Sequence, residues 1–182
     1  MDSKLLKEKA HTTIILIYNH FRSYFESGDL IVAGSYFYDH FDLSVNKTFK
    51  DIDLIVDVST SNDHILYELR DFFKDLSILN EDSSFIKAFT PGWLIGCLVF
   101  TNDYPPIDIL RQDFTTNLSS FEIFPGIFTD YQSSEKLVEV YSHLIEGFKN
   151  SGRKETIKKF ETLRDFYSAN STEKLVNDLL KL

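Results

Sequence analysis

Three aspartates are the residues of this chain whose type and spacing best suit chemistry. Asp51 and Asp53 lie two residues apart in the apolar run DIDLIVDV, and Asp108 stands between two isoleucines in PPIDILRQ. Side chains at positions i and i+2 of a strand project from the same face, roughly 7 Å apart at their Cα atoms. Carboxylates placed in this way can converge on a hard cation such as Mg²⁺. Three of them on neighbouring strands would suit a two-metal site.

The same aspartates can also be interpreted as residues on the solvent-exposed face of an edge strand. An Asp-x-Asp motif is too short to decide between the two interpretations by itself. Aspartate is a poor strand former, so its double occurrence in the middle of a strand calls for an offsetting role. Asp108, in a second short strand that follows turn residues, further favours ligands.

A glycine and a serine that end the apolar segment LIVAGS supply a second feature of chemical interest. Gly34 lets the backbone turn tightly and approach a phosphate. Backbone N–H groups and the hydroxyl of Ser35 can then donate hydrogen bonds to phosphate oxygens. Lys47 and Lys50 lie in the loop before Asp51, where they either reach triphosphate oxygens or belong to a solvated loop.

Taken in order along the chain, Gly34-Ser35, Asp51-Ile-Asp53 and Asp108 resemble the nucleotidyltransferase superfamily typified by DNA polymerase beta. The resemblance covers roughly residues 28–113. It implies a nucleotide-binding fold in which Asp51 and Asp53 bind two Mg²⁺ ions, with Mn²⁺ as an alternative. It also implies that Asp108 shares one metal and takes the proton from the attacking hydroxyl. Gly34 and Ser35 would hold the terminal phosphates.

The reaction implied is transfer of an NMP group from a nucleoside triphosphate to a hydroxyl. The acceptor is left open among a small molecule, an RNA 3′ end and a protein side chain. Two alternatives stand beside this hypothesis. One is a catalytically inactive nucleotidyltransferase-fold module that binds or regulates, and the other is a structural α/β domain whose aspartates merely face solvent.

The elements that would position these residues follow from the apolar periodicity. Alternation in DIDLIVDV predicts a strand with Ile52, Leu54 and Val56 on one face and the aspartates on the other. Apolar residues at helical spacing predict helices, and short apolar runs next to turn signals predict strands. The expected helices span 3–26, 61–76, 133–150, 153–170 and 172–182, and the further strands lie within 30–35, 83–90, 93–102 and 107–113.

These elements predict an α+β protein: a nucleotidyltransferase-like mixed β-sheet flanked by helices, with a C-terminal helical segment. We expect a catalytic domain over 1–132 and a helical segment over 133–182 that packs on or beside it. The segment NLSSFEIFPGIFTDY between them is expected to be irregular or extended.

Charge and composition limit the kinds of partner that the protein is expected to bind. The net charge is −9, and residues 1–134 carry 20 acidic against 10 basic residues, which argues against nonspecific DNA binding. No run approaches the roughly 18 apolar residues of a membrane span, so a cytoplasmic protein without a membrane partner is expected. The single cysteine, Cys97, is expected to be a small buried hydrophobe.

The C-terminal part holds a cluster of basic residues, Arg153, Lys154, Lys158 and Lys159. The cluster is interpreted as a solvated helix face, with a clamp on triphosphate or RNA as the alternative. The nearby aromatic residues Phe160, Phe166 and Tyr167 are expected to face the core.

Overall fold

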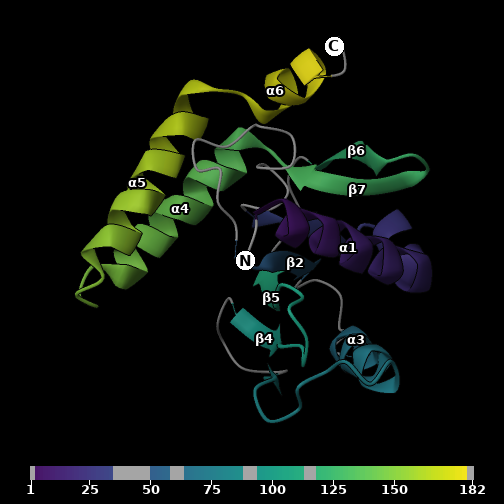
Figure 1. Cartoon of the computed structure of the whole chain (residues 1–182). Helices are drawn as coiled ribbons and strands as arrows, with labels where there is room; N and C mark the ends of the chain where they lie inside the picture. The colour runs from purple at the N-terminus through teal and green to yellow at the C-terminus, as the bar shows by residue number, and fades with distance from the viewer. Residues whose placement is uncertain (1–2, 35–49, 58–63, 88–93, 113–117, 180–182) are drawn as a thin grey trace.

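A mixed five-stranded sheet forms the centre of the computed structural model, which describes residues 3–34, 50–57, 64–87, 94–112 and 118–179. The strand order is β1-β2-β5-β4-β3, in which β2 and β5 run parallel and the other neighbours antiparallel. Helices lie on both sides of this sheet (Figure 1), so the predicted α+β architecture with a mixed sheet is confirmed. The strands are β1 (Leu30–Ala33), β2 (Ile52–Asp57), β3 (Phe85–Ile86), β4 (Leu94–Leu98) and β5 (Ile107–Gln112).

One face of the sheet packs into the main hydrophobic core. Ile52, Leu54 and Val56 of β2 are buried there, as their alternation predicts. Helices α1 (Ser3–Glu26) and α3 (His64–Asp75) supply the facing side chains. Because every second residue of β2 enters this core, Asp53 and Asp57 project from the opposite face.

Helix α1 has the bounds that its apolar spacing predicts. Its core stripe includes Ala10, Ile14, Ile17 and Phe21, all almost completely buried. Gly28 follows the helix with a positive φ of 79°, and its N–H donates to the carbonyl oxygen of Phe25. A left-handed glycine whose N–H satisfies a carbonyl of the last turn is a common way for a helix to end.

The segment before the C-terminal helices, which was expected to be irregular or extended, is a β-hairpin. It consists of β6 (Leu118–Phe124) and β7 (Ile127–Gln132), joined through Pro125 and Gly126. Gly126 has a φ of 77°, the conformation that a proline–glycine turn of type II requires at its second central residue. The hydroxyl of Thr129 in β7 accepts a hydrogen bond from the N–H of Val32, which ties the hairpin to the sheet edge.

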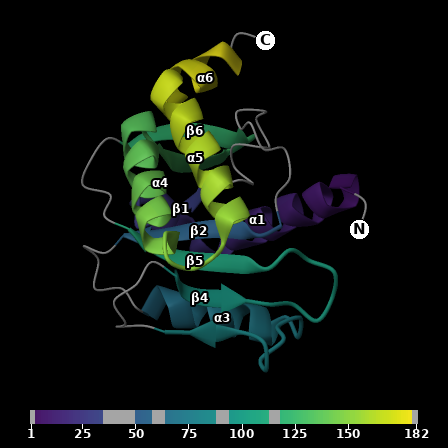
Figure 2. The ribbon, with the colours of Figure 1, turned by 90° about the vertical axis from the view of Figure 1, so that its left-hand side faces the viewer.

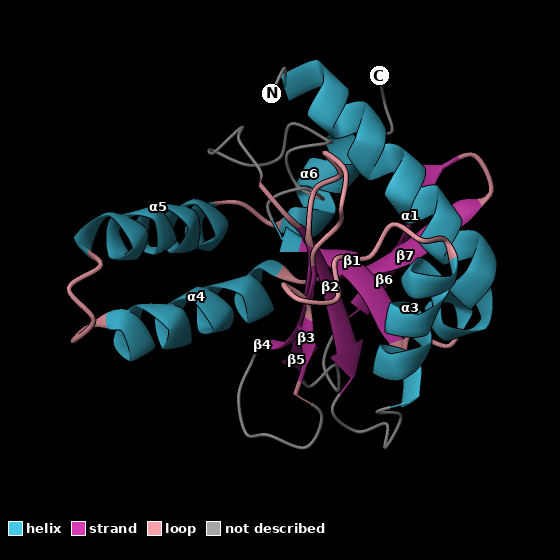
Figure 3. Cartoon of the chain, turned by 60° about the horizontal axis from the view of Figure 1, so that its bottom comes forward, coloured by secondary structure: helices cyan, strands magenta, loops and turns pink. Residues whose placement is uncertain are grey.

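Three helices end the chain: α4 (Ser134–Phe148), α5 (Lys154–Ala169) and α6 (Thr172–Leu179). The hydroxyl of Ser133 caps α4 by accepting a hydrogen bond from the N–H of Lys136. Helices α4 and α5 form an antiparallel hairpin in front of the sheet in Figure 2, whereas α1 lies behind it. Figure 3 shows the same hairpin extending to one side of the strands, away from α1 and α3.

The C-terminal helices share the core of the rest of the molecule. Leu137 of α4 and Leu163 and Tyr167 of α5 belong to the same buried cluster as the residues of α1 and the sheet. The division into domains at residue 132 stays a prediction. Among the described helices, none combines the length and the apolar character needed to cross a membrane.

Candidate functional site

Strands β2 and β5 bring two of the three aspartates into direct register. Asp53 and Asp108 are paired neighbours across the parallel β2–β5 ladder. Adjacent strands lie about 4.8 Å apart, so both side chains leave the same face of the sheet next to each other. Asp51, two residues before Asp53, lines the same cleft, and all three carboxylates are partly buried.

The negative charge of Asp108 affects the protonation of Asp51. Burial, and then the negative charge of Asp108, raise the pKa of the Asp51 carboxyl above its ordinary value. The ammonium group of Lys159, on α5, acts in the opposite direction and lowers it. A cation held at this place would therefore relieve repulsion between carboxylates that the fold places together.

Two further residues, Cys97 and Tyr141, interact with the carboxylates. Burial and a hydrogen bond from its thiol to Asp108 raise the pKa of Cys97 to about 12. Cys97 is the register partner of Asp108 across β4 and β5 and is half-buried, so its interpretation as a buried small hydrophobe is incomplete. Burial and the charge of Asp53 raise the pKa of the Tyr141 hydroxyl, which reaches the site from α4.

Gly34 lies directly against Asp53. A Cβ atom at position 34 would come within 1.7 Å of Oδ2 and 2.5 Å of Cγ of Asp53. Gly34 also has a φ of 72°, in the left-handed region that favours glycine. The glycine that the sequence singled out is thus needed both for the turn at the end of β1 and for the space that the Asp53 carboxylate occupies.

The other residues assigned to phosphates are only partly described. Ser35 and Lys47 lie outside the described residues. Lys50 is exposed just before Asp51, and its charge is the smallest of the influences that lower the pKa of that carboxyl.

A cleft of about 470 Å³ separates the carboxylate face of the sheet from the α4–α5 hairpin. Gly34, the three aspartates and Lys159 line one part of it. The remaining lining is mostly aliphatic and aromatic. It comprises Ala33, Ile55, Leu94, Leu110, Gln112, Gln132, Leu137, Val140, Tyr141, Leu144, Phe148, Phe160 and Leu163.

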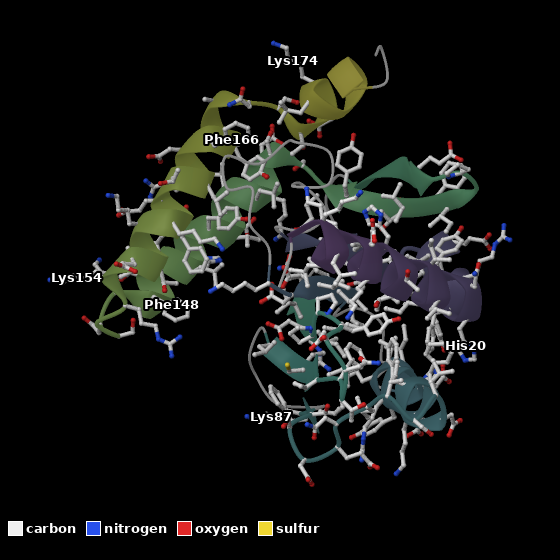
Figure 4. All side chains as sticks on the ribbon, viewed as in Figure 1. His20, Lys87, Phe148, Lys154, Phe166 and Lys174 are labelled. Carbon is white, nitrogen blue, oxygen red and sulfur yellow. The ribbon has the colours of Figure 1, made fainter. Side chains whose placement is uncertain are left out.

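The structure divides the basic cluster of α5. Lys154 and Lys158 are exposed, and Figure 4 shows Lys154 on the outer side of the hairpin. Lys159 is exposed as well, but it also lines the cleft and acts on Asp51. The sequence offered a triphosphate clamp only as the alternative for the whole cluster, although the position of Lys159 four residues before the buried Leu163 is a helical spacing that points to the same face.

The aromatic prediction for α5 is confirmed for Tyr167, which is buried in the core. Phe160 lines the cleft, where its ring lies 5.9 Å from that of Tyr141 and 5.9 Å from that of Phe148. These three rings form an aromatic wall across the cleft from the carboxylates. Figure 4 shows Phe148 near the turn of the hairpin, remote from Phe166.

The donor chemistry of the three aspartates suits Mg²⁺, which prefers carboxylate oxygens. Among the residues that the structure describes, no three His, Cys, Asp or Glu side chains are grouped closely enough to hold a metal ion. The three carboxylates thus line one cleft, and Asp51 and Asp108 interact electrostatically, but in the described structure they do not form a complete set of metal ligands.

Comparison with models of known protein families gives no match for this chain. Comparison with curated proteins gives no match either. The functional argument therefore rests on the geometry of the cleft and on the residue pattern.

Proposed function

We propose that the chain is a Mg²⁺-dependent nucleotidyltransferase that moves an NMP group from a nucleoside triphosphate to a hydroxyl acceptor. The observation that carries the proposal is the in-register pair Asp53 and Asp108, with Asp51 on the same face and Gly34 against Asp53. The order of these residues along the chain also resembles the nucleotidyltransferase superfamily.

The residues have distinct roles in this proposal. Asp51, Asp53 and Asp108 hold the metal ions, and Asp108 takes the proton of the attacking hydroxyl. When bound, two Mg²⁺ ions would neutralise the charge that develops on the attacking and leaving oxygens. Lys159 adds a positive charge at the same end of the cleft, where it can face the triphosphate.

A transfer assay with an internal control tests the proposal. The protein is incubated with each labelled nucleoside triphosphate, Mg²⁺ and a cell extract, and labelled products are sought. Asp53→Asn should abolish transfer while the thermal unfolding curve stays close to that of the wild type. Asp57→Asn changes the same strand and the same face outside the cleft lining, and should leave transfer unchanged.

Each other outcome has a defined meaning. Transfer that survives Asp53→Asn would contradict the metal-binding role and leave the aspartates as solvent-facing residues. A folded wild type that shows no metal-dependent binding of any nucleoside triphosphate in calorimetry would support the alternative of a catalytically inactive module.

A further inference from the structure

The carboxylates occupy only one end of the cleft, and the floor of the other end is aliphatic. Ile55 follows Asp53 by two residues on β2, and Leu110 follows Asp108 by two residues on β5. Both side chains therefore lie on the carboxylate face, and they are paired in register. They pack with Ile31 and Ala33 of β1 in a small cluster that is separate from the main core.

The opposite wall at this end comes from the α4–α5 hairpin and is also aliphatic. Leu137 and Val140 line the cleft from the first half of α4, and Leu163 lines it from α5. We call the part of the cleft between these three residues and the Ile55–Leu110 floor the aliphatic end. Apolar surface on two facing walls favours a ligand portion that loses little hydration when it enters.

A pair of buried amides closes the aliphatic end. Gln112, at the end of β5, is 7% exposed and Gln132, at the end of β7, is 3% exposed. The amide nitrogen of Gln132 donates to the amide oxygen of Gln112. Each side-chain amide has more hydrogen-bonding capacity than this one bond uses, so the pair can also meet a single polar group on a ligand.

The position of the polar groups assigns the two ends to different ligand portions. Gly34, Asp51 and Lys159 are all at the carboxylate end, which is where metal ions and a triphosphate would be held. The aliphatic end continues along the strands from the point where the acceptor hydroxyl must attack. A polyanion or a polycation placed there would lose hydration without charged partners, at a high cost in free energy.

We propose that the aliphatic end binds the acceptor, and that the acceptor is a small, uncharged, mainly apolar alcohol or phenol. The inference rests on the proposed function. The whole cleft, carboxylate end included, has a volume of about 470 Å³, so its aliphatic end has room only for a small ligand. In the transfer step the acceptor oxygen forms a bond to the α-phosphorus, the bond from that phosphorus to the β-phosphate oxygen breaks, pyrophosphate leaves, and the hydroxyl proton passes to Asp108.

The test measures binding of 2-naphthol, a fluorescent bicyclic phenol, to the full chain without nucleotide or metal. The wild type should bind it saturably with one site per chain. Val140→Trp places a large side chain in the aliphatic end and should weaken binding by at least about tenfold. The control is Ser142→Trp, the same new side chain at an exposed position of the same helix, which should leave binding unchanged.

A second variant, on the sheet side of the aliphatic end, tests whether weaker binding is caused only by a distortion of α4. Leu110→Phe fills the same end from the sheet side and should also weaken 2-naphthol binding, and thermal unfolding establishes that both variants are folded. The affinity of Val140→Trp for Mg²⁺–ATP should stay within about twofold of the wild type, because the triphosphate is held at the other end.

Three results would overturn the inference: no saturable binding by the wild type, equal binding by Val140→Trp, or loss of Mg²⁺–ATP binding in that variant. The last result would assign the aliphatic end to the nucleobase. Failure of the proposed function is a separate observation, since it appears as absence of Mg²⁺–ATP binding by the wild type, which the 2-naphthol measurement does not involve.

Discussion

Gly34 and Asp53 share a space that admits no side chain at position 34. The backbone of Gly34 is left-handed, and a Cβ atom there would overlap the Asp53 carboxylate. A side chain at position 34 would therefore cost free energy in two ways, through backbone strain and through a clash with Asp53. The clash displaces a carboxylate that is central to the proposed site. Substitution of this glycine should therefore affect both stability and function.

Gly34→Ala should lower the free energy of unfolding by about 2–4 kcal/mol, because it combines backbone strain with overpacking against Asp53. The control is Gly126→Ala: Gly126 has a similar φ of 77°, but nothing lies within 4 Å of its added Cβ. That variant should lose only about 1 kcal/mol. Denaturant unfolding measures both values, and equal losses would show that the contact with Asp53 has no weight.

Cys97 reports directly on Asp108. It is the only cysteine of the chain, and its thiol donates a hydrogen bond to that carboxylate. Burial and Asp108 raise the pKa of the thiol to about 12, so little of the reactive thiolate exists near neutral pH.

Alkylation of Cys97 by iodoacetamide should therefore keep accelerating above about pH 9, where an ordinary thiol with a pKa of about 8.5 levels off. Asp108→Asn removes the negative charge, so it should lower the pKa of the thiol and speed alkylation at pH 8. A rate profile of the folded wild type that levels off near that of a free thiol would contradict the contact.

The α4–α5 hairpin is the element that turns an acidic sheet face into a cleft. It supplies the aromatic wall of Tyr141, Phe148 and Phe160, and it carries Lys159 to Asp51. Since Lys159 lines the carboxylate end of the cleft and its equally exposed neighbour Lys158 does not, the charge of Lys159 should matter more.

Lys159→Ala should weaken binding of Mg²⁺–ATP by about tenfold, because a charged hydrogen-bond donor near the triphosphate is lost. Lys158→Ala removes the same charge at an adjacent exposed position and should change the affinity little. Titration calorimetry of the two variants gives the comparison. Similar losses in both would indicate a general charge effect and no specific role for Lys159.

At the scale of the whole molecule, the features that could be predicted from the sequence are those that depend on a local pattern of apolar and polar residues. The alternation of β2 separated Ile52 and Leu54 from the aspartates, and the spacing in α1 gave its bounds. The segment that forms β6 and β7 was expected only to be irregular or extended, because two serines interrupt the apolar alternation of β6, and the pairing of its two strands was not predicted. The proline–glycine pair before Ile127 was the available signal for its turn.

The cleft itself depends on contacts between distant parts of the chain. The register that places Asp53 beside Asp108 joins strands that are more than fifty residues apart in sequence. Spacing places Lys159 on the same face of α5 as Leu163, but its approach to Asp51 depends on how α5 lies across the sheet. The sequence could therefore nominate the carboxylates, whereas their aliphatic and aromatic surroundings required the three-dimensional fold.

The central claim is that Asp51, Asp53 and Asp108 together hold metal ions that bind a nucleoside triphosphate. The most direct test is anomalous diffraction from crystals soaked in Mn²⁺ and a non-hydrolysable ATP analogue, because Mn²⁺ replaces Mg²⁺ and can be located by its scattering. The predicted result is Mn²⁺ bound between Asp53 and Asp108, with the triphosphate beside Gly34. A nucleotide bound elsewhere, or a cleft without Mn²⁺ at saturating concentration, would contradict the account.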